Sequence, residues 1–424
     1  MKNLFILIAL FFSACTPASE NKSTIVAFTG ATIIDGAAPP ITDGVLLVDQ
    51  GKVLTAGSKR DVVIPEGAQV YDVSGKFIIP GLINSHGHVG EVKGIEGGHY
   101  SRENVGENLA LYARYGITTV VSLGGDKAEA EEFRAVNDSM TTGRARLYVA
   151  GTVIIGRTPE EGNSVVDANH AMGVDIMKIR IDDNLGIVPK ISEDVYRAAI
   201  ARSHELGYKF ASHMYYLDDA KKLLDAGSDM MAHSVRDKPV DEDFVKGMKA
   251  RNVCYCPTLM REVVMYVYAD SAAFFKDPFF NQEKEFRSEV VKPLLDPTRM
   301  KEVGESWAAK IYRQQLPVAM ANLKTLSDAG VPIVMGTDSG VPTRFMGYFE
   351  HLEMEKMVEA GLTPLQVLQS ATTTAASCMG LKNVGSLQSG NWADFIVLDE
   401  DPLVDIKNTR KISAVYVSGV RVSR

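Results

Sequence analysis

Short apolar segments alternate with polar turns at both ends of the chain. Residues 26–34 and 393–398, for example, are rich in Val, Ile, Leu, Phe and Ala and are followed by turn residues such as Asp and Pro. Short β-branched segments bounded by turn residues are typical of strands. We therefore expect one small β-sandwich domain built from both chain ends, with residues 25–76 as its first part and residues 383–424 as its second.

The region between these ends alternates strand-like with helix-like patterns. Apolar runs that predict buried strands lie at residues 77–83, 117–123, 146–150, 175–181, 209–213, 230–233, 253–256 and 331–337. Helix formers with apolar spacing fill residues 103–115, 128–139, 193–206, 217–226, 241–250 and 317–329. Eight strand–helix units predict an α/β fold, a (β/α)8 TIM barrel at residues 77–382. The long connection at residues 258–330 predicts an insertion that shapes the substrate pocket.

Residues with reactive or metal-binding side chains stand at the ends of several predicted strands. They are His86, His88, Lys178, His213, His233 and Asp338. Taken alone, the triplet His86-Gly87-His88 is equally compatible with a metal site and with two solvated histidines on a loop. Side chains two apart in a strand point the same way, and imidazole and carboxylate groups bind divalent metals. Since barrel chemistry lies at the carboxyl ends of the strands, the ordered set predicts a metal site.

The first residues have the pattern of an export signal. A basic start precedes the apolar residues 4–12, which are too few to span a bilayer, and small residues lead to Cys15. The segment resembles a bacterial lipoprotein signal, residues 1–14, followed by a lipidated Cys15 and a polar tether at residues 15–24. Phe12 departs from the usual Leu, and an ordinary secretory signal is the alternative. Either way we expect an exported protein, and with the lipid a membrane-anchored one facing the periplasm or cell envelope.

Composition narrows the class of protein. The chain has 424 residues, 46% of them hydrophobic, which suffices for one large and one small domain. Its formal net charge of −8 comes without a basic block, which argues against a nucleic-acid partner. Besides Cys15, the cysteines are Cys254, Cys256 and Cys378. Cys254 and Cys256 are too close in sequence to pair with each other easily, and we expect three buried thiols.

Two longer phrases accompany the strand-end residues. The first barrel strand lies in VSGKFIIPGLINSHGH, and the barrel leads back to the small domain through TPLQVLQSATTTAASCMGLKNVGSLQSGNWADFIVLDEDPL. Together with the ligand set, they make the chain resemble the amidohydrolase superfamily, in its imidazolonepropionase-like and Xaa-Pro dipeptidase (prolidase) branch. The resemblance covers nearly everything after the signal segment.

The resemblance implies a centre with two divalent metal ions. His86, His88 and Asp338 would hold the more buried ion, and His213 and His233 the more exposed one. Lys178 would be carboxylated and bridge both ions, whereas the plainer alternative is an inward barrel lysine paired with a carboxylate. Zinc is the default for this ligand set, and manganese or cobalt also fit.

Such a centre predicts a metal-dependent hydrolase that acts on carbon–nitrogen bonds. We expect a metal-bridged hydroxide to attack an amide bond in a dipeptide or N-acyl amino acid, with Asp338 as general base and then general acid. A lactone, carbamate or phosphotriester hydrolase would use the same machinery. A non-catalytic interaction scaffold is a further alternative, disfavoured because the chain keeps the whole ligand set.

Four more residues are candidates for contacts with a small, carboxylate-bearing substrate. Tyr215 could donate to an oxyanion or a carboxylate, or pack at the rim. Arg180 could bind a carboxylate with two nitrogens. His99, after strand one, could line the pocket, and His351 could either cap a helix or contact substrate. The segment KIRIDDN after Lys178 departs from the dipeptidase pattern, which leaves dipeptide specificity open. We also expect a homo-oligomer.

Overall fold

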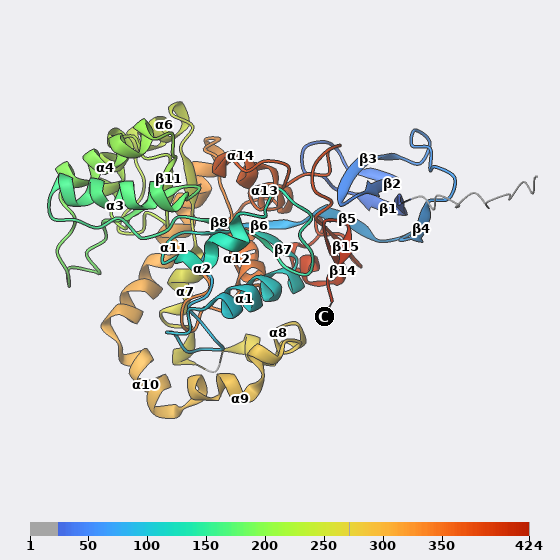
Figure 1. Cartoon of the computed structure of the whole chain (residues 1–424). Coiled ribbons are helices and arrows are strands. Elements are labelled where there is room, and N and C mark those ends of the chain that lie inside the picture. Colours follow the sequence, from blue (N-terminus) through green and yellow to red (C-terminus); the bar gives the residue numbers. More distant parts are fainter. Residues whose placement is uncertain (1–23, 271, 424) are drawn as a thin grey trace, which may run out of the picture.

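The computed structural model describes residues 24–270 and 272–423. A β-sheet domain lies at one end of the molecule and a larger α/β domain at the other (Figure 1). The predicted signal segment and the lipid-bearing Cys15 fall outside the described residues. Within the described part, no helix combines the length and the apolar character needed to cross a membrane.

The small domain is built from both ends of the chain, as the sequence predicts. Its strands are β1 (Val26–Ile33), β2 (Ile41–Asp49), β3 (Lys52–Ser58), β4 (Gln69–Asp72), β5 (Phe77–Pro80), β13 (Phe395–Leu398), β14 (Ile412–Val417) and β15 (Val420–Arg421). Their order is β15-β14-β13-β5-β1-β2-β3, with β4 on β1. Hydrogen bonding therefore makes one continuous sheet rather than the two sheets of a sandwich. Its core is aromatic, with Phe28 packed edge-on at 4.9 Å from both Phe395 and Tyr416.

The boundary between the domains lies later than predicted. The run at residues 77–83 is two strands: β5 pairs with β1 and β13 in the small domain, and β6 (Leu82–Gly87) begins the α/β domain. Gly81 joins them where a Cβ would lie 2.0 Å from Thr118 Oγ1. Both strands are buried, so the apolar pattern shows no break.

In the described residues, the larger domain has seven parallel strands in two sheets. The first is β6, β7 (Ile117–Ser122) and β8 (Arg146–Val149), and the second is β9 (Met177–Arg180), β10 (Phe210–His213), β11 (Met230–Ala232) and β12 (Cys254–Cys256). Ile154 N donates to Lys178 O at 2.7 Å, which links the two sheets at one side. On the other side residues 331–339 run between β12 and β6, held by isolated bridges from Ile333 to Tyr255 and from Ser339 to Gly87. The eighth predicted strand is thus an irregular segment.

Helices follow these strands in the expected alternation. They are α1 (Arg102–Arg114), α2 (Ala128–Arg134), α3 (Pro159–Met172), α4 (Glu193–Glu205), α5 (Leu217–Ala226) and α6 (Glu242–Ala250), and after the irregular segment α12 (Tyr348–Glu359), α13 (Pro364–Ser370) and α14 (Thr373–Met379). The helix α3 has clear signals at both ends. Thr158 caps it, Pro159 begins it, and Gly173 ends it in a left-handed conformation.

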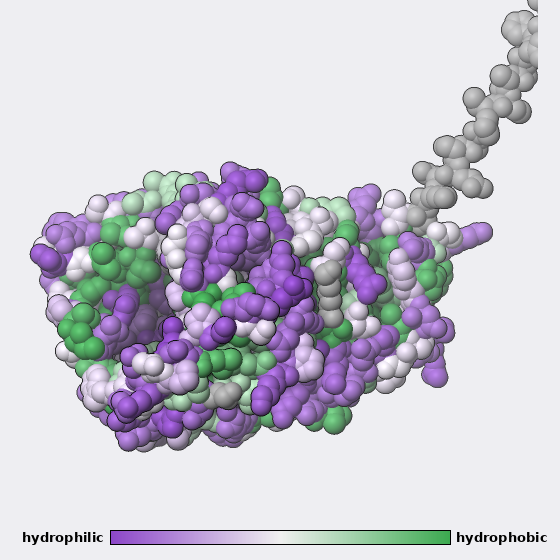
Figure 2. Space-filling view, turned by 90° about the horizontal axis from the view of Figure 1, so that it is seen from below, coloured by the Kyte–Doolittle hydropathy of each residue, from purple (hydrophilic) through white to green (hydrophobic). Residues whose placement is uncertain are grey.

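The insertion after β12 is a helical unit with an aromatic core. It contains α7 (Leu259–Val264), α8 (Pro278–Asn281), α9 (Ser288–Val291), α10 (Pro297–Glu305) and α11 (Trp307–Asp328). The helix predicted from Pro317 begins at Trp307, so this proline lies inside it. Phe280 packs on Phe286 and Phe345 with ring centroids 5.0 and 4.9 Å away. The face that carries α8, α9 and α10 is hollowed beside mixed apolar and polar patches (Figure 2).

The expectation of three buried thiols is wrong for two of the cysteines. Cys254 in β12 and Cys378 in α14 form a disulfide with their Cα atoms 6.1 Å apart, whereas Cys256 is a buried free thiol. The partners are 124 residues apart in sequence. The spacing of the cysteines in the sequence gives no sign of this pair, because α14 and β12 come into contact only in the folded protein.

We expect the double variant Cys254→Ala, Cys378→Ala to be less stable by about 2–5 kcal/mol, because the disulfide closes a long loop in the unfolded chain. Urea unfolding of the oxidised protein and the variant measures the difference. Cys256→Ala is the single-thiol control. Equal unfolding midpoints and slopes for the double variant and the oxidised wild type would show that the disulfide adds no stability.

Candidate active site

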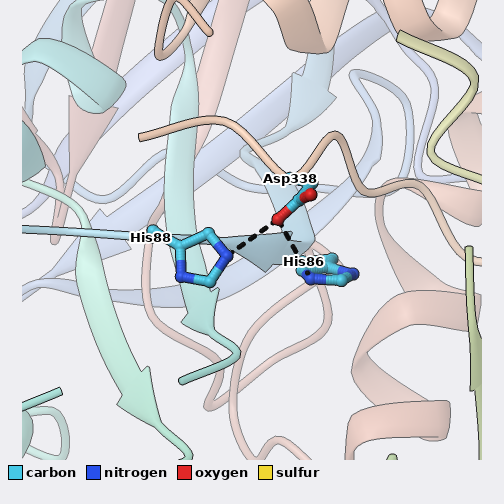
Figure 3. Close-up of side chains that lie close together, drawn as sticks. All are labelled: His86, His88 and Asp338. Atoms are coloured by element: carbon cyan, nitrogen blue, oxygen red, sulfur yellow. Dashed lines mark hydrogen bonds and ion pairs between the residues drawn. The ribbon is translucent and has the colours of Figure 1, made fainter. Parts of the chain in front are cut away.

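Three of the predicted metal ligands come together at the end of β6. Asp338 Oδ1 lies 2.8 Å from His88 Nε2 and 3.4 Å from His86 Nε2 (Figure 3). Potential ligand atoms of the three residues all lie within 4.8 Å of one another. His86 and Asp338 are buried, and His88 is half-buried.

The backbone around these ligands is closely packed. A Cβ on Gly336 would lie 2.8 Å from His86 Cβ, and one on Gly340 would lie 2.0 Å from His88 O, so both positions require glycine. Asp338 itself adopts a left-handed conformation with φ 58°, as does His233 with φ 74°. Non-glycine residues rarely adopt this conformation and often serve a function when they do.

A buried carboxylate holds the segment that carries Asp338. Glu350 Oε1 in α12 accepts hydrogen bonds of 2.6 Å from Asn84, Thr337 and Ser339. Burial raises the pKa of the Glu350 carboxyl. Because Asn84 belongs to β6 and the other two donors flank Asp338, Glu350 fixes the two ligand-bearing segments relative to each other.

Two further histidines continue the row of imidazoles. The ring centroid of His233 lies 4.6 Å from that of His86 and 4.2 Å from that of His213. His213 ends β10, and His233 directly follows β11. The structure therefore brings the four predicted histidine ligands together at the carboxyl ends of β6, β10 and β11.

Three of these imidazoles have one ring nitrogen held by a protein group outside the predicted ligand set. His88 Nδ1 lies 2.9 Å from the Gly124 carbonyl, His213 Nε2 lies 3.0 Å from Asp182 Oδ2, and His233 Nδ1 lies 2.7 Å from Thr258 Oγ1. Metal-binding histidines characteristically have their second nitrogen held in this way. In His86, the Nδ1 atom is buried and has no hydrogen-bond partner within the described residues.

Burial also sets the protonation state of these histidines. It lowers the pKa of His86 and of His233 well below the ordinary value, and that of His213 to about 3. All three are therefore neutral at neutral pH, which is the form that binds metal. Burial alone would raise the pKa of Asp338, but Arg344 and the adjacent imidazoles hold it well below its usual range.

Lys178 is buried in β9. It is 3% exposed, and its Nζ atom has no hydrogen-bond partner among residues 24–270 and 272–423. Burial lowers its pKa to about 8. The carboxylate partner of the plainer alternative does not occur within hydrogen-bond distance in the described part. A buried, easily deprotonated amine fits carboxylation, so the residues present fit a binuclear metal centre.

Three site residues were missed by sequence analysis. Arg261 and Arg344 are near Asp338: Arg261 Nε lies 3.7 Å from Asp338 Oδ2, and Arg344 donates to the same oxygen. Asp182 is the partner of His213 and lies in the segment KIRIDDN, whose departure from the dipeptidase pattern was the available signal. Arg261 lies in the short helix α7 and Arg344 on a loop, and their sequence neighbours give no comparable signal.

The predicted substrate contacts lie in different surroundings. Arg180 is exposed and donates to Asn184 Oδ1 at 2.7 Å. His99 is exposed on the loop after β6. Tyr215 is buried, donates its hydroxyl proton to Gln315 and packs under the Arg236 guanidinium. For these three residues a contact with substrate remains a prediction.

The prediction that His351 contacts substrate is wrong. This histidine is 1% exposed in α12, with Nδ1 2.9 Å from Thr409 Oγ1 and Nε2 2.8 Å from the Tyr115 carbonyl. Both nitrogens are therefore occupied by groups that support the fold. Neither partner is near His351 in sequence, so the pattern around it gave no sign of this role.

We expect Asp182→Asn to weaken metal binding at His213 about 10- to 100-fold, because the carboxylate that orients this imidazole is lost. Titration of the metal-free protein with zinc in the presence of a competing chelator measures the affinity. Asp183→Asn is the matched control, since Asp183 accepts from Tyr216 and not from a histidine. Equal affinities in the two variants would remove Asp182 from the site.

Comparisons with known proteins agree with this architecture. The profile of the amidohydrolase family matches residues 77–422. A dihydroorotase from Pelotomaculum thermopropionicum is 24% identical over 399 residues, covering 88% of each chain. A 5-methylthioadenosine/S-adenosylhomocysteine deaminase from Bacillus cereus is 22% identical over 408 residues, covering 85% of this chain and 81% of the relative.

Solved structures share the fold. A protein from Bifidobacterium longum assigned as a prolidase superposes with a TM-score of 0.76 at 23% identity, covering 94% of this chain and 95% of the other. Phenylurea hydrolase B superposes with a TM-score of 0.74 at 20% identity, covering 94% and 97%. These likenesses imply a TIM barrel with an attached β-domain. With the profile match over most of its length, the chain belongs to the amidohydrolase family.

Proposed function

We propose that this protein is a metal-dependent hydrolase of carbon–nitrogen bonds, acting on an amide bond in a dipeptide or N-acyl amino acid. The observation that carries the proposal is the cluster of four imidazoles and Asp338 beside the buried Lys178, whose Nζ atom has no hydrogen-bond partner among the described residues. Membership of the amidohydrolase family supports a hydrolase. The names of the relatives, among them a dihydroorotase and a phenylurea hydrolase, fit carbon–nitrogen chemistry.

In this proposal the site holds two divalent metal ions, zinc by default and manganese or cobalt as alternatives. His86, His88 and Asp338 would hold one ion, His213 and His233 the other, and a carboxylated Lys178 both. When bound, such ions supply a water activated for attack near neutral pH and polarise a carbonyl oxygen. The anchored nitrogens of His88, His213 and His233 keep these rings oriented toward the centre.

Asp338 moves the proton in the proposed reaction. Its low pKa keeps it ionised, so it can accept a proton from the attacking water and return it to the leaving nitrogen as the carbon–nitrogen bond breaks. Arg180 and His99 would act at the exposed rim. Tyr215 could act as an oxyanion donor only after its hydroxyl leaves Gln315.

A substrate panel tests the proposal. The metal-loaded enzyme is offered Xaa-Pro and Xaa-Arg dipeptides, N-acyl amino acids, and a lactone, a carbamate and a phosphotriester. We expect turnover of at least one dipeptide or N-acyl amino acid, abolished by a chelator and restored by zinc. Turnover of only the last three compounds would favour the alternative hydrolase reactions, and no turnover of any compound would contradict the proposal.

We also propose export as a lipoprotein anchored through Cys15. The disulfide between Cys254 and Cys378 supports an oxidising compartment, since such bonds are rare in the cytosol. Fractionation of cells that express the full chain tests the anchor. The wild type should be in the membrane fraction and Cys15→Ser outside it, and identical fractionation would refute the lipid.

A further inference from the structure

The two carboxylate oxygens of Asp338 have different neighbours. Oδ1 lies 2.8 Å from His88 Nε2 and 3.4 Å from His86 Nε2, on the side of the metal ligands. Oδ2 accepts from Arg344 and lies 3.7 Å from Arg261 Nε. One edge of the proposed base thus faces the metal ligands, and the other faces two guanidinium groups.

Arg344 is held at the site but keeps donors to spare. A tight turn after Asp338, with Gly340 N donating to Arg344 O at 3.1 Å and Arg344 N to Val341 O at 3.0 Å, fixes its backbone. Its Nη1 atom donates to the side chain and the backbone carbonyl of Asp338. Its Nε and Nη2 atoms make no hydrogen bond with the described residues, and the side chain is 17% exposed. These donors are available to a ligand that enters from solvent.

Arg261 is a fixed positive charge behind this position. Its side chain is 8% exposed, with Nη1 3.1 Å from Glu262 Oε1 and Nη2 3.8 Å from Asp182 Oδ2. Glu353 holds the start of α7 through the backbone amides of Leu259 and Met260, at 2.8 and 2.7 Å. Arg261 therefore has little freedom to move away when a ligand binds.

The ion-paired side chains near Asp338 balance one another. Arg236, Arg261 and Arg344 lie against three carboxylates, those of Asp182, Glu262 and Asp338. Metal ions at the imidazoles would add positive charge that a lysine carbamate and a hydroxide offset only in part. An anionic group on the substrate would restore the balance, and a guanidinium pairs with a carboxylate through two parallel hydrogen bonds.

We infer that Arg344, backed by Arg261, binds a carboxylate on the leaving-amine side of the substrate. This inference rests on the proposed function and assigns the specificity to residues other than Arg180 and Tyr215. An anion on Arg344 lies beside Asp338 Oδ2, and therefore next to the residue proposed to return a proton to the leaving nitrogen. The carboxylate should therefore be on the released amine, as in an amino acid with a free α-carboxyl group.

The test compares the best panel substrate with its C-terminal carboxamide. We expect the wild type to favour the free acid at least about 10-fold in kcat/KM, and Arg344→Met to lose this preference mainly through a higher KM. Because Arg344 also contacts Asp338, its replacement can slow both substrates, so the measure is the ratio of kcat/KM for the acid to kcat/KM for the carboxamide, in which an equal effect on both cancels. Arg202→Met, which breaks a surface ion pair of α4, is the control and should keep the preference.

A binding measurement separates failure of the inference from failure of the proposed function. Calorimetry compares the wild type and Arg344→Met with the amino acid released from the best substrate and with its carboxamide. If no panel member is hydrolysed, N-acetyl-L-alanine and N-acetyl-L-alaninamide serve as inert ligands. Loss of the preference for the acid in Arg344→Met would support the inference. The inference is overturned if Arg344→Met keeps the preference, or if only Arg180→Met removes it. A wild type that binds acid and carboxamide equally would also overturn it.

Discussion

Replacing Asp338 with asparagine is expected to lower kcat/KM by about 10³-fold or more and to leave the fold intact. Asparagine has nearly the same shape, so the contacts of the segment held by Glu350 persist. It cannot accept a proton from water at neutral pH, and its amide is a poorer metal ligand than a carboxylate. Both losses act on the same reaction, which is why the effect should be large.

Steady-state kinetics on the best panel substrate, with metal content measured on the same sample, tests this expectation. Asp243→Asn, at an exposed position in the first turn of α6, is the control and should retain activity. Circular dichroism and thermal unfolding report whether the variant is folded. Activity within about 10-fold of the wild type in a folded, metal-loaded Asp338→Asn protein would remove this residue as the general base.

Lys178→Met should lower the activity of the enzyme and raise the stability of the metal-free protein. Activity should fall by about 10³-fold or more because methionine cannot be carboxylated and the two metals lose their shared ligand. The metal-free protein, however, should become more stable, because a buried amine without a partner is replaced by an apolar chain of similar length. The shift of the Lys178 pKa from 10.5 to about 8 means that the protonated, buried lysine destabilises the folded metal-free protein by about 3 kcal/mol at pH 7.

The pH dependence of this difference has a defined direction. The unfolded lysine keeps its proton up to a pKa of 10.5, whereas the folded one loses it near 8, so the unfolded state binds more protons between these values. The stability of the metal-free wild type should therefore rise relative to Lys178→Met from pH 8 to 10.5. Urea unfolding of both proteins after chelation, with Lys246→Met as an exposed control, measures it. A Lys178→Met protein that is less stable than the wild type at pH 7 would contradict the account.

The positions of the candidate ligands could be predicted because they follow from the topology, whereas their roles as metal ligands were implied by the family resemblance and remain predictions. His86, Lys178, His213 and Asp338 each lie in or just after an apolar run, and parallel strands bring their carboxyl ends to one face. The same pattern could not locate the break between β5 and β6, because strands of both domains are equally buried there. It also could not show that residues 331–339 form single bridges rather than a strand, since that depends on how β12 and β6 approach each other.

The partners of the ligands could not be predicted because they come from loops and distant helices. Arg261 lies in the insertion, where the sequence shows helix formers but not the direction of α7. Arg344 reaches Asp338 through a turn whose path depends on Gly340. His351 and Cys378 were misassigned for a related reason: their partners Thr409, Tyr115 and Cys254 are close only in the folded chain.

The metal content of the purified wild type tests the central claim most directly. Elemental analysis of protein loaded with zinc in bicarbonate buffer should give about two metal ions per chain, the number that the paired ligand set would hold. Lys178→Met measured in parallel should hold fewer. A wild type that binds no metal under these conditions, with Lys178→Met indistinguishable from it, would contradict a binuclear hydrolase and favour a scaffold without catalysis.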